Sequence, residues 1–309
     1  MQRHVIDRAL PSDARGAAIA LGNFDGVHLG HRAVIASAAR AGAEIGAPLG
    51  VALFVPHPRK FLQPQTAPFR LQSADQRARA LADLGVDHFY EIGFNRGLFP
   101  LTDREFAQRV LAQLLGAKHV SVGSNFRFGT QRMGDVAALT QYGGEFGFSV
   151  DGVPTVVDAQ GETISSTAIR EHISRGDMER AASLLGRPWA IEGVVLRGFA
   201  RGRTIRFPTI NLALGDYLRP LLGVYAVRVD LGDEHWRAGV ANVGLNPTTG
   251  VLPAPLLEAH IFDFDGDLYD RWVEVQLLSF LRPEAHFESM EAMARQIEAD
   301  AAQARALLA

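Results

Sequence analysis

The stretch AAIALGNFDGVHLGH (residues 17–31) runs from a short apolar segment into a turn with three glycines, one aspartate and two histidines. The alanine-rich residues 32–46 predict a helix, so the histidines lie where a buried strand turns into a helix. Such a turn presents unpaired backbone N–H groups and the positive end of the helix dipole. Glycine lets a bulky anion approach closely, and His28 and His31 share one face of the first helical turn. The pattern is typical of a site for a phosphate whose charge grows during displacement.

Short apolar runs alternate with helical patterns through the rest of the first half. The predicted elements are strands at 49–58, 88–94 and 118–123 and helices at 73–85 and 102–116. Ser73 would cap the first of these helices, and Glu105, three residues after Thr102, gives the second a capping box. Strands that alternate with helices imply a parallel sheet, which binds ligands at the carboxyl ends of its strands. The turn at 22–31 would lie at that edge.

The chain changes character near residue 187. Strand-like runs then follow at 190–196, 223–231, 235–244, 256–264 and 268–280, before a helical stretch at 286–308. Several strands at such short spacing predict a small antiparallel barrel. We therefore expect two domains, residues 1–186 and residues 187–309.

The composition is that of an ordinary soluble globular protein. Of 309 residues, 47% are hydrophobic and 21% charged, and the net charge of −3 gives no general attraction to nucleic acid or to an anionic membrane. Cysteine is absent, which excludes disulfides, cysteine-ligated zinc and thiol nucleophiles. Residues 1–10 lack the apolar core of a signal peptide, and no apolar run approaches membrane-spanning length. We expect a cytoplasmic protein without a nucleic-acid or membrane partner, whose oligomeric state the sequence does not predict.

A second polar cluster favours a phosphate site. Ser165, Ser166 and Thr167 stand at a predicted helix start, with Arg170 one turn later. Serine at such a position is usually only a cap, but three hydroxyls and an arginine in one turn suit a polyphosphate. Between the two phosphate stretches, residues 122–129 form a strand end and a polar loop, from which Asn125 could reach a base or a ribose.

The opening turn also has other interpretations. Its glycines could serve only the turn, with both histidines on a solvated surface. Asp25, His28 and His31, together with His57, could instead hold the metal of a hydrolase. The metal interpretation is weaker, because the ligands lie in a loop and a first turn and lack the i, i+4 spacing of a helical pair.

The ordered motifs carry a resemblance to a known family. GNFDGVHLGH (22–31), VGSNFRFG (122–129) and ISSTAIR (164–170) resemble the nucleotidylyltransferase half of the bacterial bifunctional riboflavin kinase/FMN adenylyltransferases. Four further motifs resemble the kinase half of the same family: RGFARGRTIRFPTIN (197–211), GVYAV (223–227), GVANVGLNPT (239–248) and LEAHIFDFDGDLYD (257–270). The resemblance spans nearly the whole chain. It implies a Rossmann-like nucleotidylyltransferase domain, then a riboflavin-kinase-like β-barrel and a C-terminal helix.

The resemblance implies that the first domain joins AMP from ATP to FMN, which yields FAD and pyrophosphate. The ATP triphosphate would be held by Gly22, Asn23, Phe24 and the catalytic His28 and His31. It would be closed from the other side by Ser165, Ser166, Thr167 and Arg170, and Asn125 would belong to the substrate pocket. Adenylyl transfer needs Mg²⁺ and an aligned FMN phosphate but no covalent intermediate, so the lack of cysteine is no obstacle.

The second domain would phosphorylate riboflavin to FMN with ATP. Thr209 and Asn211, two apart in an extended chain, face the same side, and their oxygens suit Mg²⁺. By resemblance, Glu258 is the base that takes the proton of the riboflavin 5′-hydroxyl. A flexible cationic flap over the nucleotide would be formed by Arg197, Gly198, Arg201, Gly202 and Arg203.

Each of these kinase residues also has an ordinary interpretation. Threonine is common in strands, Pro208 could mark an edge strand, and Glu258 could be a surface carboxylate at a strand end. The arginines could form a solvated face or a weak RNA patch, although the lack of interleaved aromatic residues disfavours RNA.

Four residues depart from the family pattern, all in the kinase half. Ala200, Arg206 and Asp270 stand where glycine is usual, and Ile210 stands where alanine is usual. Arg206 adds a long cation where the backbone should pass close to a ligand, which lowers the expected kinase efficiency. A narrower hypothesis is therefore an FMN adenylyltransferase with an impaired kinase domain. A non-enzymatic protein that senses flavin or nucleotide is a further alternative.

Overall fold

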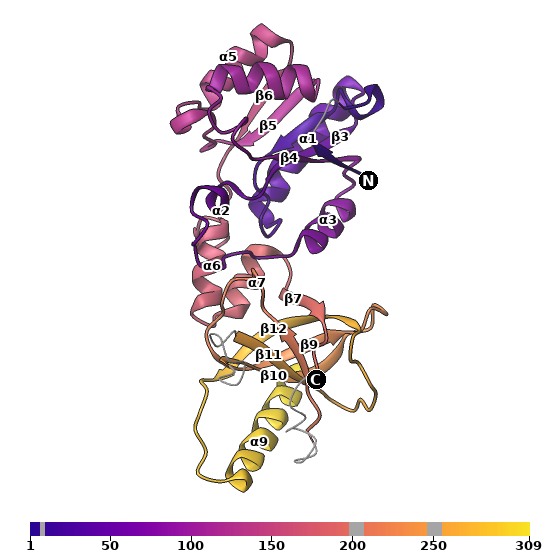
Figure 1. The fold of residues 1–309 in the computed structure, drawn as a ribbon, viewed down its shortest axis with the longest axis vertical. Coiled ribbons are helices and arrows are strands. Elements are labelled where there is room, and N and C mark those ends of the chain that lie inside the picture. Colours follow the sequence, from indigo (N-terminus) through magenta and orange to yellow (C-terminus); the bar gives the residue numbers. More distant parts are fainter. Residues whose placement is uncertain (7–9, 198–206, 246–254) are drawn as a thin grey trace. The chain divides into compact units, whose positions relative to one another are not determined.

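The computed structural model describes residues 1–6, 10–197, 207–245 and 255–309 (Figure 1). Their contacts define two compact units. The first comprises Met1–Ala67 and Ala74–Ser165, and the second comprises Pro68–Ser73 and Ser166–Ala309. The chain therefore passes between the units three times. Among the helices of the described residues, none combines the length and apolar character that a membrane crossing requires.

The first unit is built on a six-stranded parallel sheet with the strand order β1-β4-β3-β2-β5-β6. Its strands are β1 (Gln2–Ile6), β2 (Ala18–Leu21), β3 (Leu49–Val55), β4 (His88–Gly93), β5 (His119–Gly123) and β6 (Ser149–Val153). Its helices are η1 (Ser12–Ala14), α1 (Leu29–Ile45), α2 (Pro58–Leu62), α3 (Ala74–Asp83), α4 (Asp103–Glu105), η2 (Phe106–Leu114), η3 (Thr130–Arg132) and α5 (Val136–Phe146). The predicted parallel sheet is confirmed. Its strand order reverses at β2, so the switch point where such sheets bind ligands lies between β2 and β5.

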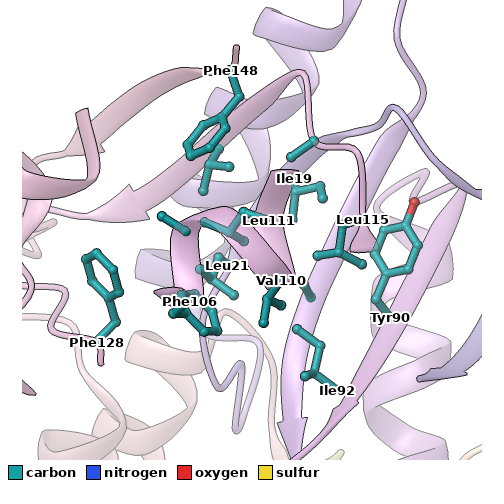
Figure 2. Packing of buried hydrophobic residues seen from close by; sticks show 14 of the residues in the cluster. Ile19, Leu21, Tyr90, Ile92, Phe106, Val110, Leu111, Leu115, Phe128 and Phe148 are labelled. Carbon is teal, nitrogen blue, oxygen red and sulfur yellow. The ribbon is translucent and has the colours of Figure 1, made fainter. Parts of the chain in front are cut away.

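Both faces of the central strands β2, β3, β4 and β5 are buried, as is usual for parallel sheets. On one face, Ile19 and Leu21 of β2 pack with Leu111 of η2 and further apolar side chains (Figure 2). On the other face, Ala20 packs in a cluster that contains Val34 of α1. The alternation along β2 follows the two-residue period of a strand. The two clusters together hold the carboxyl end of β2 and the start of α1 in place.

The helix predicted at 102–116 is present, but most of it is a π-helix, η2. Its capping box is confirmed, because Thr102 accepts the Glu105 N–H and the Glu105 carboxylate accepts the Thr102 N–H. In a π-helix the hydrogen bonds run from residue i to i+5. Side chains five residues apart, such as Phe106 and Leu111, therefore face the sheet together, and both are buried.

The second unit holds a six-stranded antiparallel sheet with the order β7-β12-β9-β10-β11-β8. Its strands are β7 (Trp189–Val194), β8 (Ile210–Ala213), β9 (Gly223–Asp230), β10 (Arg237–Leu245), β11 (Pro255–Ile261) and β12 (Trp272–Arg282). Its helices are α6 (Ser166–Ser174), α7 (Met178–Leu185) and α9 (Met290–Leu308). Beyond β7, the Leu196 N–H donates to the Asn211 carbonyl oxygen of β8 at 2.8 Å, which brings the two ends of the strand order together. The predicted small barrel is confirmed in this nearly closed form.

The last helix, α9, begins at Met290 and not at residue 286 as predicted, because the Ser289 hydroxyl caps it by accepting the Ala292 N–H. It lies against β9 and β10 of the barrel (Figure 1). The buried Asp300 of α9 accepts three hydrogen bonds of 2.7 to 3.1 Å from the guanidinium of Arg282 in β12. One ion pair thus fastens the end of the chain to the barrel.

Residues 68–73, which we call the inserted segment, lie between α2 and α3 in sequence but belong to the barrel unit. The indole Nε1 of Trp189 donates to the Leu71 carbonyl oxygen at 2.7 Å, and Nε of Arg170 donates to the Phe69 carbonyl oxygen at 2.8 Å. Phe69 and Leu71 are buried. Part of the first half of the chain is thus built into the second unit, which differs from the predicted simple division at residue 187.

Candidate active sites

The loop that follows β2 has an unusual backbone conformation. Phe24 and Val27 have φ angles of 49° and 41°, and Gly26 has a φ of 95°. A left-handed φ is rare outside glycine and is costly at a β-branched residue such as Val27. Phe24 and Val27 are each 1% exposed within the apolar cluster on the α1 side of the sheet, and this burial offsets the cost. The core therefore fixes the path of the loop, as binding an anion through backbone N–H groups requires.

His28 is the N-cap of α1 and not a residue of its first turn, as the spacing alone predicted. Its backbone is extended, and its Nδ1 accepts the backbone N–H of His31 at 3.2 Å. The two rings still stack, with centroids 3.6 Å apart and planes at 20°. Because Nδ1 is an acceptor, we assign the proton of the neutral His28 ring to Nε2.

The switch point of the parallel sheet gathers several predicted site residues. Asn23 follows β2 and Asn125 follows the neighbouring β5, and both side chains are exposed. Gly30, in the first turn of α1, lies so close to Ile164 that a Cβ atom would be 3.0 Å from the Ile164 carbonyl oxygen. Ser165, the next residue, therefore lies beside the opening turn.

The other residues predicted to close on ATP lie in the second unit. Ser166 and Thr167 start α6, and Arg170 follows one turn later, as predicted. The Arg170 guanidinium lies 5.5 Å from the Phe69 ring centroid, in addition to its hydrogen bond to the Phe69 backbone. The predicted cluster of hydroxyls and an arginine is thus divided between the two units after Ser165.

A group of aromatic side chains in the first unit was missed by the sequence analysis. Phe94 contacts Phe54, Phe61 and Phe99, with ring centroids 5.7, 5.2 and 6.2 Å away. Phe54 stands near the end of β3 and Phe94 directly after β4, so this aromatic group lies at the carboxyl ends of the strands. Phe99 is 44% exposed. Partly exposed rings offer a planar ligand a flat apolar surface, and the recurrence of phenylalanine at strand ends was the signal for it.

The barrel unit contains a cavity of about 430 Å³. Thr209 and Asn211 line it, as do Asp265 and Asp267 from the loop between β11 and β12. Glu258 of β11 stands directly opposite Asn211 of β8 in the antiparallel ladder, so the two side chains project from the same face. Glu258 itself does not line the cavity. The structure nevertheless brings the predicted base next to a predicted metal ligand.

The departures from the family pattern divide between described and undescribed residues. Residues 198–206 lie outside the described part of the chain. They include the predicted phosphate ligands Gly198, Arg201, Gly202 and Arg203, and the two departures Ala200 and Arg206. Ile210 is buried and paired with Ala259, a small residue that leaves room for it. Asp270 has a φ of 62°, which explains why glycine is usual at its position.

The metal-hydrolase interpretation gains no support from the geometry. The part of the chain that the structure describes contains no group of three or more histidine, aspartate or glutamate residues placed to hold a metal ion. His57 instead caps α2, where its Nδ1 accepts the Arg59 N–H at 3.1 Å.

The structure thus combines a parallel sheet, with a glycine-containing turn at its switch point, and a barrel that contains a cavity. This combination is the one expected of a two-domain nucleotide-dependent transferase. The family model for FAD synthetase matches residues 10–168, and the model for riboflavin kinase matches residues 185–308. The chain belongs to the bifunctional riboflavin kinase/FMN adenylyltransferase family.

Known proteins of this family match the chain over nearly its full length. The bifunctional riboflavin kinase/FMN adenylyltransferase of Pseudomonas fluorescens is 43% identical over 97% of this chain and 96% of the relative. The protein of the same name from Escherichia coli K12 is 39% identical over 94% of this chain and 92% of the relative. A crystal structure described as a macrolide-efflux protein from Streptococcus pneumoniae is 32% identical, with a TM-score of 0.85 over 96% of this chain and 97% of that chain.

Proposed function

We propose that this chain carries out two consecutive reactions. It phosphorylates riboflavin to FMN with ATP, and it adenylylates FMN with a second ATP to give FAD and pyrophosphate. One observation carries the proposal: the two halves of the chain, each with its own candidate site, are matched separately by the FAD synthetase and riboflavin kinase families. Because the riboflavin kinase match extends over residues 185–308, the narrower hypothesis of an adenylyltransferase with an impaired kinase lacks support.

We assign adenylylation to residues 1–186 and kinase activity to residues 187–309. The ends of the two family matches, at 168 and 185, support a boundary in this region. A fragment of residues 1–186 should fold and make FAD from FMN and ATP. Its stability should be lower than that of the same region in the full chain, because Leu71 loses the Trp189 indole that donates to it. A folded fragment that forms no FAD would contradict this division.

In adenylyl transfer, a phosphate oxygen of FMN attacks the α-phosphorus of ATP, and the bond to the β-phosphate breaks. We infer that the backbone of Gly22, Asn23 and Phe24 holds the triphosphate, since the core fixes the path of this loop. His28 and His31 would stabilise the negative charge that grows on the α-phosphate and on pyrophosphate. The backbone hydrogen bond to Nδ1 leaves Nε2–H as the donor of the neutral His28 ring.

The remaining residues of the adenylylation site would bind and orient the substrates. We assign the triphosphate also to Ser165, Ser166, Thr167 and Arg170, whose hydroxyl and guanidinium donors suit phosphate oxygens. Asn125 would contact FMN or the nucleotide at the switch point. The aromatic group around Phe94 would hold the flavin ring, because a planar ring matches its partly exposed surface.

In the kinase reaction, the riboflavin 5′-hydroxyl attacks the γ-phosphorus of ATP, and ADP leaves. Glu258 would accept the hydroxyl proton. Thr209 and Asn211 fit Mg²⁺, since both line the cavity and offer hard oxygen ligands. Bound there, Mg²⁺ would neutralise part of the phosphate charge. Gly198, Arg201, Gly202 and Arg203 remain the proposed ligands of the ATP phosphates.

Incubation of the full chain with riboflavin, ATP and Mg²⁺, followed by chromatography of the flavins, tests both activities together. We expect FMN to appear first and FAD later. FAD from added FMN but none from riboflavin would restrict the chain to adenylylation, and flavin binding without product would indicate a sensing protein. Cell fractionation tests the cytoplasmic location that we propose for these ATP-dependent reactions.

A further inference from the structure

Asp270 occupies a left-handed position, with a φ of 62°, where the family pattern has glycine. Aspartate is one of the few other residues that tolerate this conformation. The Asp270 N–H donates to the Val195 carbonyl oxygen at 3.1 Å, and the Val195 N–H donates to the Arg271 carbonyl oxygen at 2.9 Å. The backbone at Asp270 is therefore joined to the segment that leads from β7 to Arg197.

The side chains of Asp270 and Arg197 form an ion pair, with Oδ2 and Nη2 3.2 Å apart. The Arg197 guanidinium also lies over the Tyr269 ring, 5.3 Å from its centroid. Both members of the pair are about three-quarters exposed, at 74% and 73%. Such a pair is weak in water, worth roughly 0.2–1 kcal/mol, so a more highly charged anion can replace the carboxylate.

The ion pair lies at the rim of the barrel cavity. Val195 and Tyr269, which precede its two members in sequence, both line the cavity. Leu196, adjacent to Arg197, donates its N–H to the carbonyl oxygen of Asn211. A triphosphate held at Thr209 and Asn211 would therefore come within reach of the Arg197 side chain, and it carries several negative charges against the single charge of Asp270.

We propose that Asp270 is a positioning residue of the kinase, which holds Arg197 over Tyr269 until the triphosphate of ATP takes the guanidinium from it. The inference rests on the kinase activity proposed above. Because ATP must displace the carboxylate, Asp270 weakens ATP binding at the barrel. Glycine at this position leaves no carboxylate to displace.

The test measures the KM for ATP in FMN formation. Asp270→Asn removes the charge and keeps a residue suited to left-handed backbone, and Asp270→Gly restores the residue usual in the family. Both should lower the KM for ATP about two- to fivefold, with kcat unchanged. The difference from the unmutated chain should vanish at about 1 M salt, where charges are screened within roughly 3 Å. Glu145→Gln, which removes a carboxylate from an exposed arginine pair in the first unit, should leave this KM unchanged.

A double-mutant cycle separates the tether from a direct effect of the charge. In an Arg197→Gln background, Asp270→Asn should no longer lower the KM. A decrease in KM that persists there would overturn the proposal that Asp270 acts by holding Arg197. An unchanged or raised KM in Asp270→Asn alone would overturn it as well. A change in kcat alone would make Asp270 a structural residue only. Absence of FMN formation by the unmutated chain would overturn the proposed kinase function itself, and the inference with it.

Discussion

In the parallel-sheet unit, the proposed catalytic side chains lie in one loop and the first turn after it, whereas in the barrel unit they lie on two strands. His28 and His31 are neighbours because α1 begins between them. Asn211 and Glu258 are neighbours only because β8 and β11 pair in one register. The two histidines are thus contained in a short stretch of sequence, while Asn211 and Glu258 depend on the pairing of distant segments. The two activities should therefore fail independently of each other, and for different reasons.

The sharpest separation should come from Glu258→Gln, which keeps the shape of the side chain and removes its basicity. FMN formation should fall by about 10²–10⁴-fold, because a general base typically contributes that much. FAD formation from added FMN should persist in the same preparation. Glu274→Gln, the same change on β12, serves as the control and should keep both activities. Normal FMN formation in Glu258→Gln would show that Glu258 is not the base but an ordinary carboxylate at a strand end.

The folding stability of the barrel unit should depend more on the buried Arg282–Asp300 pair than on the exposed Arg305–Asp263 pair. Asp300→Ala leaves the Arg282 guanidinium without its buried carboxylate, a change that typically costs about 3–5 kcal/mol of folding stability. Chemical denaturation should show this loss, together with lower kinase activity. Asp263→Ala removes the exposed partner of Arg305 on the same helix and should change little. Equal stability losses in the two variants would contradict the anchoring role of Asp300.

In the first unit, His28 both caps a helix and is proposed to stabilise charge, and His28→Asn separates the two roles. The asparagine oxygen can still accept the His31 N–H, so α1 keeps its cap. The kcat of FAD formation should nevertheless fall by about 10²–10³-fold, with less effect on FMN binding. FMN formation from riboflavin is the internal control. If His28→Asn makes FAD at a normal rate while His28→Ala does not, the residue matters only as a cap.

The smallest expected effect is a pH dependence of the first unit. His119 is buried between Ser121 and Ser149, and burial lowers its pKa, with Asp151 partly opposing the shift. The folded state therefore favours the neutral ring, and the unfolded chain binds more protons below about pH 6.5. The contribution of His119 to the free energy of unfolding should be fully present above that pH. Below it, the free energy of unfolding should fall by at most about 1.4 kcal/mol per pH unit. Denaturation at pH 7.5 and 5.5 tests this, and His119→Gln should flatten the profile.

Local patterns in the sequence were sufficient for much of the fold and of the first site. The capping box at Thr102, the alternation of strands with helices and the glycine-containing turn at 22–31 are local patterns. The structure contains the capping box, the parallel sheet implied by the alternation, and the turn between β2 and α1. The phosphate-binding role of the turn stays a prediction. The N-cap position of His28 was not predictable, because the strained φ of Val27 delays the start of α1 and depends on burial in the core.

Features that depend on long-range contacts escaped the sequence analysis. The pairing of Asn211 with Glu258 requires a strand register, and the aromatic group around Phe94 requires knowledge of which strand ends are neighbours. The burial of Leu71 against Trp189 requires a contact across 118 residues. The recurrence of phenylalanine at strand ends hints at the aromatic group, but the other two contacts leave no local pattern.

The inserted segment also has a consequence for the order in which the protein is made. The ribosome releases Leu71 long before Trp189, whose indole donates to it. Since they are 118 positions apart and synthesis runs at about 5–20 residues per second, the interval is roughly 6–24 s. During that time β4, β5 and β6 of the parallel sheet are made, while Leu71 has no barrel to pack against. The barrel can only be completed onto a segment that emerged from the ribosome well before it.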